Sequence, residues 1–165
     1  MRLIGSDNIP EIVANAFRTA LTPYSGACFI SLPQDVLSDS TDCKPIPGIA
    51  APEYGEAPKE LIAQAAALIN QAKQPVILLG MEASRQNNAK AIRALLKKHP
   101  FALIGIYQAA GVVSKEYVDL FMGRWGLFKN QPGDQLLDIA DVVLTIGYNP
   151  VEYDPEIWNA TNKKR

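Results

Sequence analysis

The chain has 165 residues, 48% of them hydrophobic and 20% charged, which is typical of one ordinary globular domain with a core of its own. Its formal net charge of −1 argues against a nucleic-acid or anionic-membrane partner, and no apolar run is long enough to span a bilayer. Its two cysteines, Cys28 and Cys43, form neither a disulfide framework nor a metal cluster, so we expect a reducing cytoplasm.

The N-terminal part of the chain combines one amphipathic helix with one short strand. Residues Asn8–Leu21 place apolar side chains at the 3.6-residue period of a helix. Asn8, followed by Glu11 three residues later, predicts a capping pair at the start of this helix. The apolar run Ala27–Leu32 then predicts a strand, which Pro33 ends.

Residues 38–57 differ in character from the segments on either side. They contain Pro45, Pro47 and Pro52 and show little hydrophobic periodicity. A structureless loop of this length is unusual inside a compact domain, so we interpret residues 38–57 as a linker between domains. The chain would then divide into a first part at 1–37, this linker, and a second part at 58–165.

Helices and strands alternate from residue 58 onward. The predicted helices are 58–72, 88–98 and 132–140, and the predicted strands are 76–79, 101–106 and 142–146. The first of these helices is expected to bury one apolar face, made of Leu61, Ile62, Ala65, Leu68 and Ile69. Strands that are apolar on both faces and alternate with helices indicate an α/β fold, a Rossmann-like parallel sheet with helices on both faces.

Ligands of such sheets bind beyond the carboxyl ends of the strands, so the candidate positions follow each strand. These positions are Gly80–Glu82, Tyr107–Gly111 and Gly147–Asn149, and residues 123–133 are expected nearby. Gly80 could begin a phosphate-binding turn, but such a turn needs several glycines and no adjacent carboxylate. Since Glu82 follows, a plain strand-to-helix turn is favoured.

Four polar side chains in these segments could contact a ligand, namely Gln108, Arg124, Asn130 and Gln131. Arg124 could bind a carboxylate or phosphate or stack on an aromatic ring, but a structural salt bridge or a contact with Trp125 is favoured. The backbone amides that precede the helix at 132–140 could hold an anion, or Asn130 or Gln131 could simply cap that helix. No base, nucleophile and oxyanion site can be assembled from the sequence, and its single histidine makes no metal site of normal spacing.

The most distinctive segments are FISLPQDV at 29–36, YQAAG at 107–111, GRWGLFKNQPGD at 123–134 and IGYNPVEYDPEIWN at 146–159. They resemble the acetolactate synthases, a family of thiamine diphosphate enzymes. The first segment is similar to the end of their pyrimidine-binding domain, and the other three to the central domain of the catabolic branch. The resemblance implies a piece of the pyrimidine-binding domain at 1–37, a linker at 38–57, and a central domain at 58–165 that is truncated at its C-terminus.

By this resemblance, the parent enzyme condenses two pyruvates to 2-acetolactate with loss of carbon dioxide, as a homodimer or homotetramer. Its cofactors are thiamine diphosphate and Mg²⁺, and the family motifs that bind them lie outside this chain. The chain is therefore expected to be an inactive structural module that contacts the remaining domains of the same enzyme. Gln108, Arg124, Asn130 and Gln131 are the side chains that could reach the active-site wall.

The biosynthetic branch of the same family binds FAD, and this chain departs from its pattern after three strands. Where that branch is rich in glycine, this chain reads Gly80-Met81-Glu82. Gln108-Ala109-Ala110-Gly111 replaces a Met-Gly-Leu-Gly-like turn, and Tyr148–Val151 replaces an Arg-containing segment. These departures predict that no FAD is bound. A free-standing nucleotide-binding or regulatory domain, with an adenine nucleotide at Gly80 and Gly147, stays open as the alternative.

Overall fold

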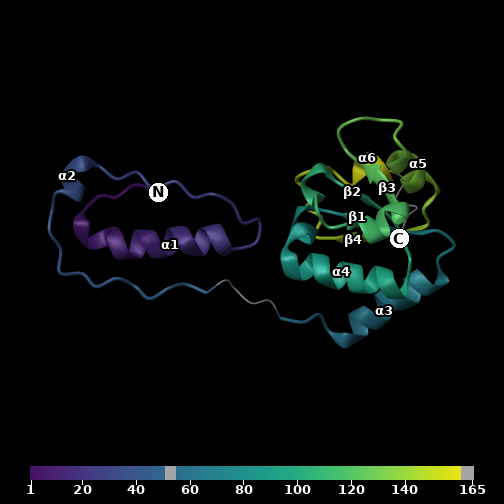
Figure 1. The fold of residues 1–165 in the computed structure, drawn as a ribbon, viewed down its shortest axis with the longest axis horizontal. Helices are drawn as coiled ribbons and strands as arrows, with labels where there is room; N and C mark the ends of the chain where they lie inside the picture. The colour runs from purple at the N-terminus through teal and green to yellow at the C-terminus, as the bar shows by residue number, and fades with distance from the viewer. Residues whose placement is uncertain (51–54, 161–165) are drawn as a thin grey trace. The chain divides into compact units, whose positions relative to one another are not determined.

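The structure is a computed structural model that describes residues 1–50 and 55–160. Contacts within the chain divide it into two compact units, Met1–Glu56 and Ala57–Arg165 (Figure 1). The first unit is built around one long helix, and the second is built around a parallel sheet.

Helix α1 (Ile9–Leu21) of the first unit lies where the sequence predicts it, but the expected capping pair is wrong. The side chain of Asn8 makes no capping hydrogen bond, and its backbone is already helical, with φ −88° and ψ −3°. The reason is the short 3-10 turn η1 (Ser6–Asn8), which continues directly into α1. A capping residue needs an extended backbone, and Asn8 does not have one.

The strand predicted at Ala27–Leu32 is wrong for this chain. Only an isolated parallel bridge joins Arg2 to Ser31, where the N–H of Leu3 donates to the carbonyl of Ser31 at 3.1 Å. A strand needs a continuous partner for its backbone groups, and the described residues of this unit supply only this short one. The apolar run consequently stays unburied, and the side chain of Phe29 is 79% exposed.

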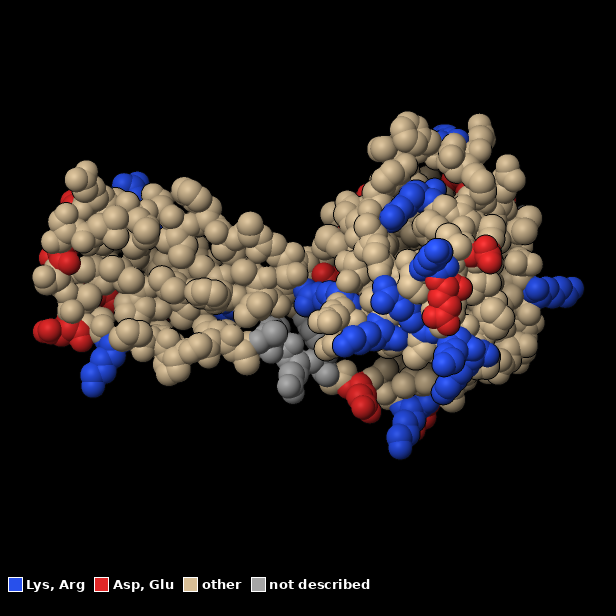
Figure 2. All heavy atoms as spheres, viewed as in Figure 1, with Lys and Arg blue, Asp and Glu red and all other residues tan. Residues whose placement is uncertain are grey.

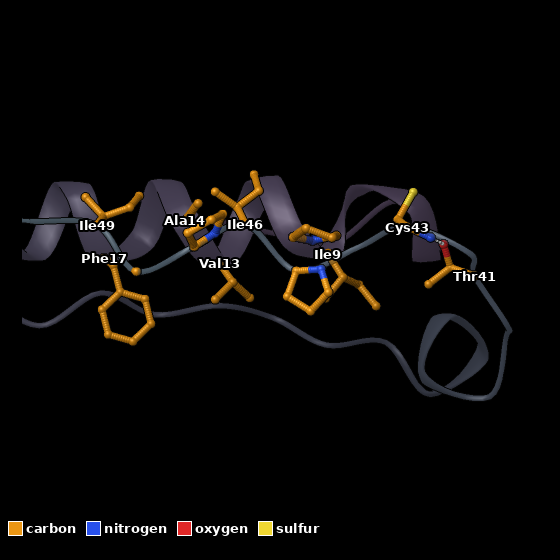
Figure 3. A pocket seen from close by; sticks show the side chains of 12 residues that line it. Ile9, Val13, Ala14, Phe17, Thr41, Cys43, Ile46 and Ile49 are labelled. Atoms are coloured by element: carbon orange, nitrogen blue, oxygen red, sulfur yellow. Dashed lines mark hydrogen bonds between the residues drawn. The ribbon is translucent and has the colours of Figure 1, made fainter.

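The sequence did not predict the one-turn helix α2 (Gln34–Leu37). The segment that follows this helix runs back alongside α1. Hydroxyl groups fix its start to η1: Ser6 donates to Asp39 at 2.9 Å, and Thr41 donates to Asp7 at 2.6 Å. An apolar hollow of about 430 Å³ lies between α1 and the segment (Figure 3). Part of the predicted linker is therefore packed within the first unit, and its role between domains stays a prediction.

The second unit contains a four-stranded parallel sheet with the strand order β3-β2-β1-β4. The strands are β1 (Pro75–Leu79), β2 (Ala102–Gly105), β3 (Phe121–Arg124) and β4 (Val142–Ile146). The helices are α3 (Lys59–Gln71), α4 (Gln86–Lys98), α5 (Pro132–Ile139) and α6 (Glu156–Asn159). Short 3-10 turns follow β1 at η2 (Met81–Ser84), follow β2 at η3 (Tyr107–Ala109) and precede β3 at η4 (Lys115–Leu120).

This strand order confirms the predicted Rossmann-like fold. The chain passes from β1 to β2 to β3 in one direction and then crosses back to β4 on the other side of β1. Right-handed crossovers therefore place α4 and α5 on opposite faces of the sheet, as Figure 1 shows. The predicted helices and strands of this unit are confirmed to within two residues, but β3 and α6 were missed because neither carries a regular apolar pattern.

Helix α3 forms as predicted, but its apolar face is not buried. Leu61 and Ile62 are each 56% exposed, and no residue of the helix is buried. Hydrophobic periodicity predicts that a helix has an apolar face but does not determine what covers that face. The core lies instead around β1 and β2, where Leu78, Leu79 and Leu103 are fully buried.

The carboxylate of Asp141 joins the starts of β1 and β4. Its two oxygens accept the backbone N–H groups of Lys73 and Gln74 at 2.7 Å and 2.9 Å. These hydrogen bonds to the charged form lower the pKa of Asp141 below its usual value. Asp141 therefore contributes to stability as a carboxylate.

Replacement of Asp141 by Asn is expected to destabilise the chain at pH 7, because the amide is neutral and has only one acceptor oxygen. Because the pKa of Asp141 is lower in the folded chain, its carboxylate stabilises the fold at pH values above its unfolded-state pKa of about 3.9. This stabilisation is lost as the pH falls through the folded-state pKa of Asp141. Urea unfolding should therefore show a difference between wild type and variant that shrinks below about pH 4. Asp138→Asn, at an exposed position on α5, is the matched control, and a pH-independent difference would contradict this role of Asp141.

Candidate functional site

The point where the strand order reverses lies between β1 and β4, and doubly wound sheets bind ligands outside the carboxyl ends of the strands at such a point. In this structure the two chain segments that leave β1 and β4 are in direct contact. The N–H of Gly80 donates to the carbonyl of Ile146 at 2.9 Å, and the N–H of Glu82 donates to the carbonyl of Gly147 at 3.1 Å. The crevice that would admit a ligand is therefore closed by backbone.

Both glycines are required by this contact. A Cβ atom on Gly80 would lie 2.2 Å from the carbonyl oxygen of Gly147. A Cβ atom on Gly147, whose φ is +63°, would lie 2.3 Å from the backbone nitrogen of Ala83. Gly80 therefore allows two backbone segments to pack closely and does not provide room for a phosphate. This agrees with the interpretation of Gly80 as a plain strand-to-helix turn. An adenine nucleotide at Gly80 and Gly147 would need these segments to separate.

An aromatic cluster occupies the region beyond β3 and β4. The ring of Tyr153 packs edge-on against the ring of Trp125, with 5.3 Å between the two centroids. The same Tyr153 ring also leaves no room for a side chain at position 126, because a Cβ atom on Gly126 would lie 2.5 Å from it. Trp158 donates from Nε1 to the hydroxyl of Tyr148 at 3.3 Å, and that hydroxyl donates to the carbonyl of Tyr153. Side chains thus fill this end of the sheet.

A charged group of three side chains lies beside the closed crevice. Arg85 pairs with Glu82 at 2.6 Å, and the half-buried Glu152 lies close enough to Glu82 for repulsion between the carboxylates. Burial, and then the charge of Glu82, raise the pKa of Glu152. The hydroxyl of Ser84, in the same turn as Glu82, donates to the carbonyl of Met81 at 2.7 Å.

Arg124 is fixed at the end of β3. Its Nη1 atom donates to the carbonyl of Ile106 at 2.9 Å and to that of Tyr107 at 3.4 Å. The centre of its guanidinium lies 5.7 Å from the centroid of the Phe121 ring. The predicted salt bridge is not formed among the described residues, and the ring beside the guanidinium is that of Phe121 and not that of Trp125. Arg124 instead holds backbone carbonyls.

Gln108 is exposed on the loop after β2, and a second arginine holds the far end of this loop. Arg93, on α4, donates from Nε to the carbonyl of Val112 at 2.8 Å and from Nη2 to that of Gly111 at 2.6 Å. The sequence gives no sign of this role for Arg93, because an arginine on an amphipathic helix carries no signal of the carbonyls it will contact. The loop is thus held by an arginine at each end.

Asn130 and Gln131 are exposed and serve the start of α5. Asn130 has φ +62°, a left-handed conformation that asparagine tolerates. Gln131 is the N-cap residue, and its N–H donates to the carboxylate of Asp134 at 2.8 Å. Because a carboxylate of the chain already binds this amide, the geometry favours helix capping over an external anion. No hydrogen bond within the described residues joins any two of Gln108, Arg124, Asn130 and Gln131.

The described residues contain no group of three or more His, Cys, Asp or Glu side chains that could hold a metal ion. Cys28 and Cys43 are both exposed and form no disulfide with each other. None of the described helices combines the length and the apolar character that crossing a bilayer requires.

Comparisons with known proteins give one consistent family. A family model described as "Thiamine pyrophosphate enzyme, central domain" matches residues 62–164. The chain is 52% identical over 152 residues to an acetolactate synthase of Bacillus subtilis, which covers 92% of this chain and 27% of that protein. It is 39% identical over 160 residues to a catabolic acetolactate synthase of Raoultella terrigena, which covers 97% of this chain and 29% of that protein.

A comparison of structures agrees with these matches at the level of the fold. A solved structure described as a thiamin diphosphate-dependent enzyme of Mycobacterium smegmatis aligns with a TM-score of 0.58 and 24% identity, over 94% of this chain and 30% of that one. The chain thus spans less than a third of the length of these relatives.

Alanine substitution at three glycines should separate backbone contact from backbone strain. Gly80→Ala is expected to destabilise the chain by about 3 kcal/mol or more, because the new Cβ meets backbone. Gly111→Ala, in open space but at φ +81°, should cost about 1–2 kcal/mol. Gly48→Ala, which has neither constraint, should change stability by less than about 0.5 kcal/mol in chemical denaturation. Equal effects at Gly80 and Gly48 would show that the crevice is not closed by backbone contact.

Proposed function

Because this chain belongs to the thiamine pyrophosphate enzymes and carries their central domain at residues 62–164, we propose that it is a structural module of an acetolactate synthase. The observation that carries this proposal is the likeness to two acetolactate synthases over nearly the whole chain, including the segment that precedes the central domain. The whole enzyme would condense two pyruvates to 2-acetolactate and release carbon dioxide. It would act in the cytoplasm, as a homodimer or homotetramer.

Thiamine diphosphate supplies the carbanion chemistry of such an enzyme, and Mg²⁺ would anchor its diphosphate. The described residues do not fit the metal ion, because they offer no group of three or more His, Cys, Asp or Glu side chains that could hold it. The cofactors would therefore be held by the remaining domains of the enzyme. The part played by this chain is to pack against those domains and to shape the wall of the active site.

The absence of FAD belongs to the same proposal. A dinucleotide would have to enter where the strand order reverses, and there the segments after β1 and β4 are in backbone contact at Gly80 and Gly147. The ring of Tyr153, packed on Trp125 and Gly126, occupies further space beyond the strands. These contacts support a flavin-free enzyme. They also argue against the alternative of a free-standing nucleotide-binding domain.

The loops that follow the strands would supply the wall of the active site. Gln108 is exposed between two anchored ends of its loop, and Arg124 is held beside it. Asn130 and Gln131 lie exposed at the start of α5. We assign these four side chains to the wall because each is polar and lies in a segment that follows, or at the end of, a strand of the sheet.

The proposed activity is tested by comparing this chain with a longer protein that contains it and extends on both sides to the length of its relatives. With thiamine diphosphate and Mg²⁺, the longer protein is expected to form 2-acetolactate from pyruvate, and residues 1–165 alone are expected to form none. The purified longer protein should show no flavin absorbance. Acetolactate production by residues 1–165 alone, or stoichiometric flavin in the longer protein, would contradict the proposal.

The wall assignment is tested by Gln108→Ala in the longer protein. Loss of one side-chain hydrogen bond at the active-site wall should lower kcat/KM for pyruvate by about three- to tenfold without changing thermal stability. Gln135→Ala, at an exposed position on α5, provides the matched control and should leave the kinetics unchanged. Pyruvate kinetics of Gln108→Ala equal to those of the control would remove Gln108 from the wall.

A further inference from the structure

Arg93 joins helix α4 to the end of the loop that follows β2. Its Nε atom donates to the carbonyl of Val112 at 2.8 Å, and its Nη2 atom donates to the carbonyl of Gly111 at 2.6 Å. The two carbonyls belong to successive residues, so one side chain fixes the orientation of two neighbouring peptide groups. Hydrogen bonds from a charged donor are stronger than those between neutral groups, and the planar guanidinium presents its N–H groups in a fixed arrangement.

The helix that carries Arg93 is itself fixed on the sheet. Ile92 and Leu96 of α4 are 4% and 2% exposed and belong to the hydrophobic core. Arg93 is partly buried, which shields its hydrogen bonds to the loop from competition with water. Arg93 therefore reaches the loop from a rigid element.

The loop is weakly packed near its end, at Ala110 and Gly111. Both residues are exposed, and a Cβ atom on Gly111 would meet no atom within 4 Å. A glycine also has little intrinsic restriction of its backbone, and Gly111 has φ +81°. The hydrogen bond from Arg93 supplies the restraint that glycine lacks.

Gln108 lies between the part of the loop that Arg93 holds and the part that Arg124 holds. It belongs to the 3-10 turn η3, which has three residues. Such short turns have poor hydrogen-bond geometry and little stability of their own. Ala109 places its side chain in the core at 5% exposure. The course of η3 is otherwise set by its two flanks, and an arginine holds each of them.

We propose that Arg93 is a positioning residue for Gln108. By holding the carbonyls of Gly111 and Val112, Arg93 keeps η3 in one conformation and keeps the Gln108 side chain at the active-site wall. It acts on the wall through the loop and not by contact with substrate. Such a role rests on the proposed function, because Gln108 affects activity only where it lines the active site.

The order of the loop is tested in the full 165-residue chain by ¹⁵N relaxation of its backbone amides. In the unaltered chain, the amides of Gln108, Ala110 and Gly111 should have order parameters of about 0.85, the value of rigid backbone, and Arg93→Ala should lower them below about 0.6. The amides of β1 and β4 should keep their order in this variant, because the change is local.

Two further variants complete this measurement. Lys90→Ala removes an equal charge from an exposed position on α4 and should leave the loop ordered. Arg93→Lys keeps the charge without the planar fork of donors, so its loop should have intermediate order. Arg93→Lys decides the matter if Arg93→Ala does not fold. Loop order parameters equal to those of the unaltered chain would overturn the proposal.

A double-mutant cycle in the longer protein tests whether Arg93 acts through Gln108. Arg93→Ala should lower kcat/KM for pyruvate by about two- to fivefold, which is no more than Gln108→Ala does. In a protein that already carries Gln108→Ala, the change at Arg93 should have no further effect, since the side chain that it positions is gone. Arg93→Lys should recover part of the loss, and Lys90→Ala should leave the kinetics unchanged.

The two measurements separate the role of Arg93 from the proposed function. A longer protein that forms no 2-acetolactate refutes the proposed function, and the loop order in the 165-residue chain then decides whether Arg93 holds the backbone at Gln108. An active longer protein refutes the role of Arg93 alone if Arg93→Ala keeps full kcat/KM, or if the losses from the two substitutions multiply. Unchanged kinetics in Gln108→Ala would refute that role as well.

Discussion

The contact between the segments that leave β1 and β4 is the constraint on which the rest of the second unit depends. Gly80 and Gly147 approach so closely that neither position can hold a side chain. This approach closes the point where the strand order reverses, which doubly wound sheets commonly keep open for a ligand. The fold therefore keeps the architecture of a nucleotide-binding domain and uses its usual binding position for packing.

With this crevice closed, the loop after β2 is the next feature at this edge of the sheet. Two arginines on different elements, Arg93 and Arg124, hold the loop after β2 by its backbone carbonyls. Contacts to backbone carbonyls do not depend on the side chains of the loop, but Gly111, at φ +81°, still favours glycine. Gln108 lies exposed between these two anchored ends.

The exposed apolar surfaces of the chain agree with a module that contacts other domains. Leu61 and Ile62 on α3 and Phe17 on α1 are each more than half exposed, although their spacing is that of a buried helix face. Apolar surface of this kind commonly marks a contact site. In the proposed acetolactate synthase, the remaining domains would cover these helix faces.

Sequence patterns located the helices and strands of the second unit well, because strands apolar on both faces and helices with one apolar face differ in period. Prediction failed where structure depends on distant partners. Ala27–Leu32 has the composition of a strand but lacks a continuous neighbour, and α3 has an apolar face without a cover. The hydrophobic pattern of Phe121–Arg124 is irregular and did not predict β3. This segment is a strand because it pairs with β2.

The sequence by itself determined the fold class, the order of its elements and, through its motifs, the family to which the chain is similar. Only the tertiary structure decided what the candidate residues do. Gly80 was a possible phosphate turn until Gly147 was placed against it, and only the structure shows that Arg124 holds two backbone carbonyls beside the ring of Phe121. The physical reason is that a residue's role is set by the neighbours that folding brings to it from distant parts of the chain, and local sequence does not encode their positions.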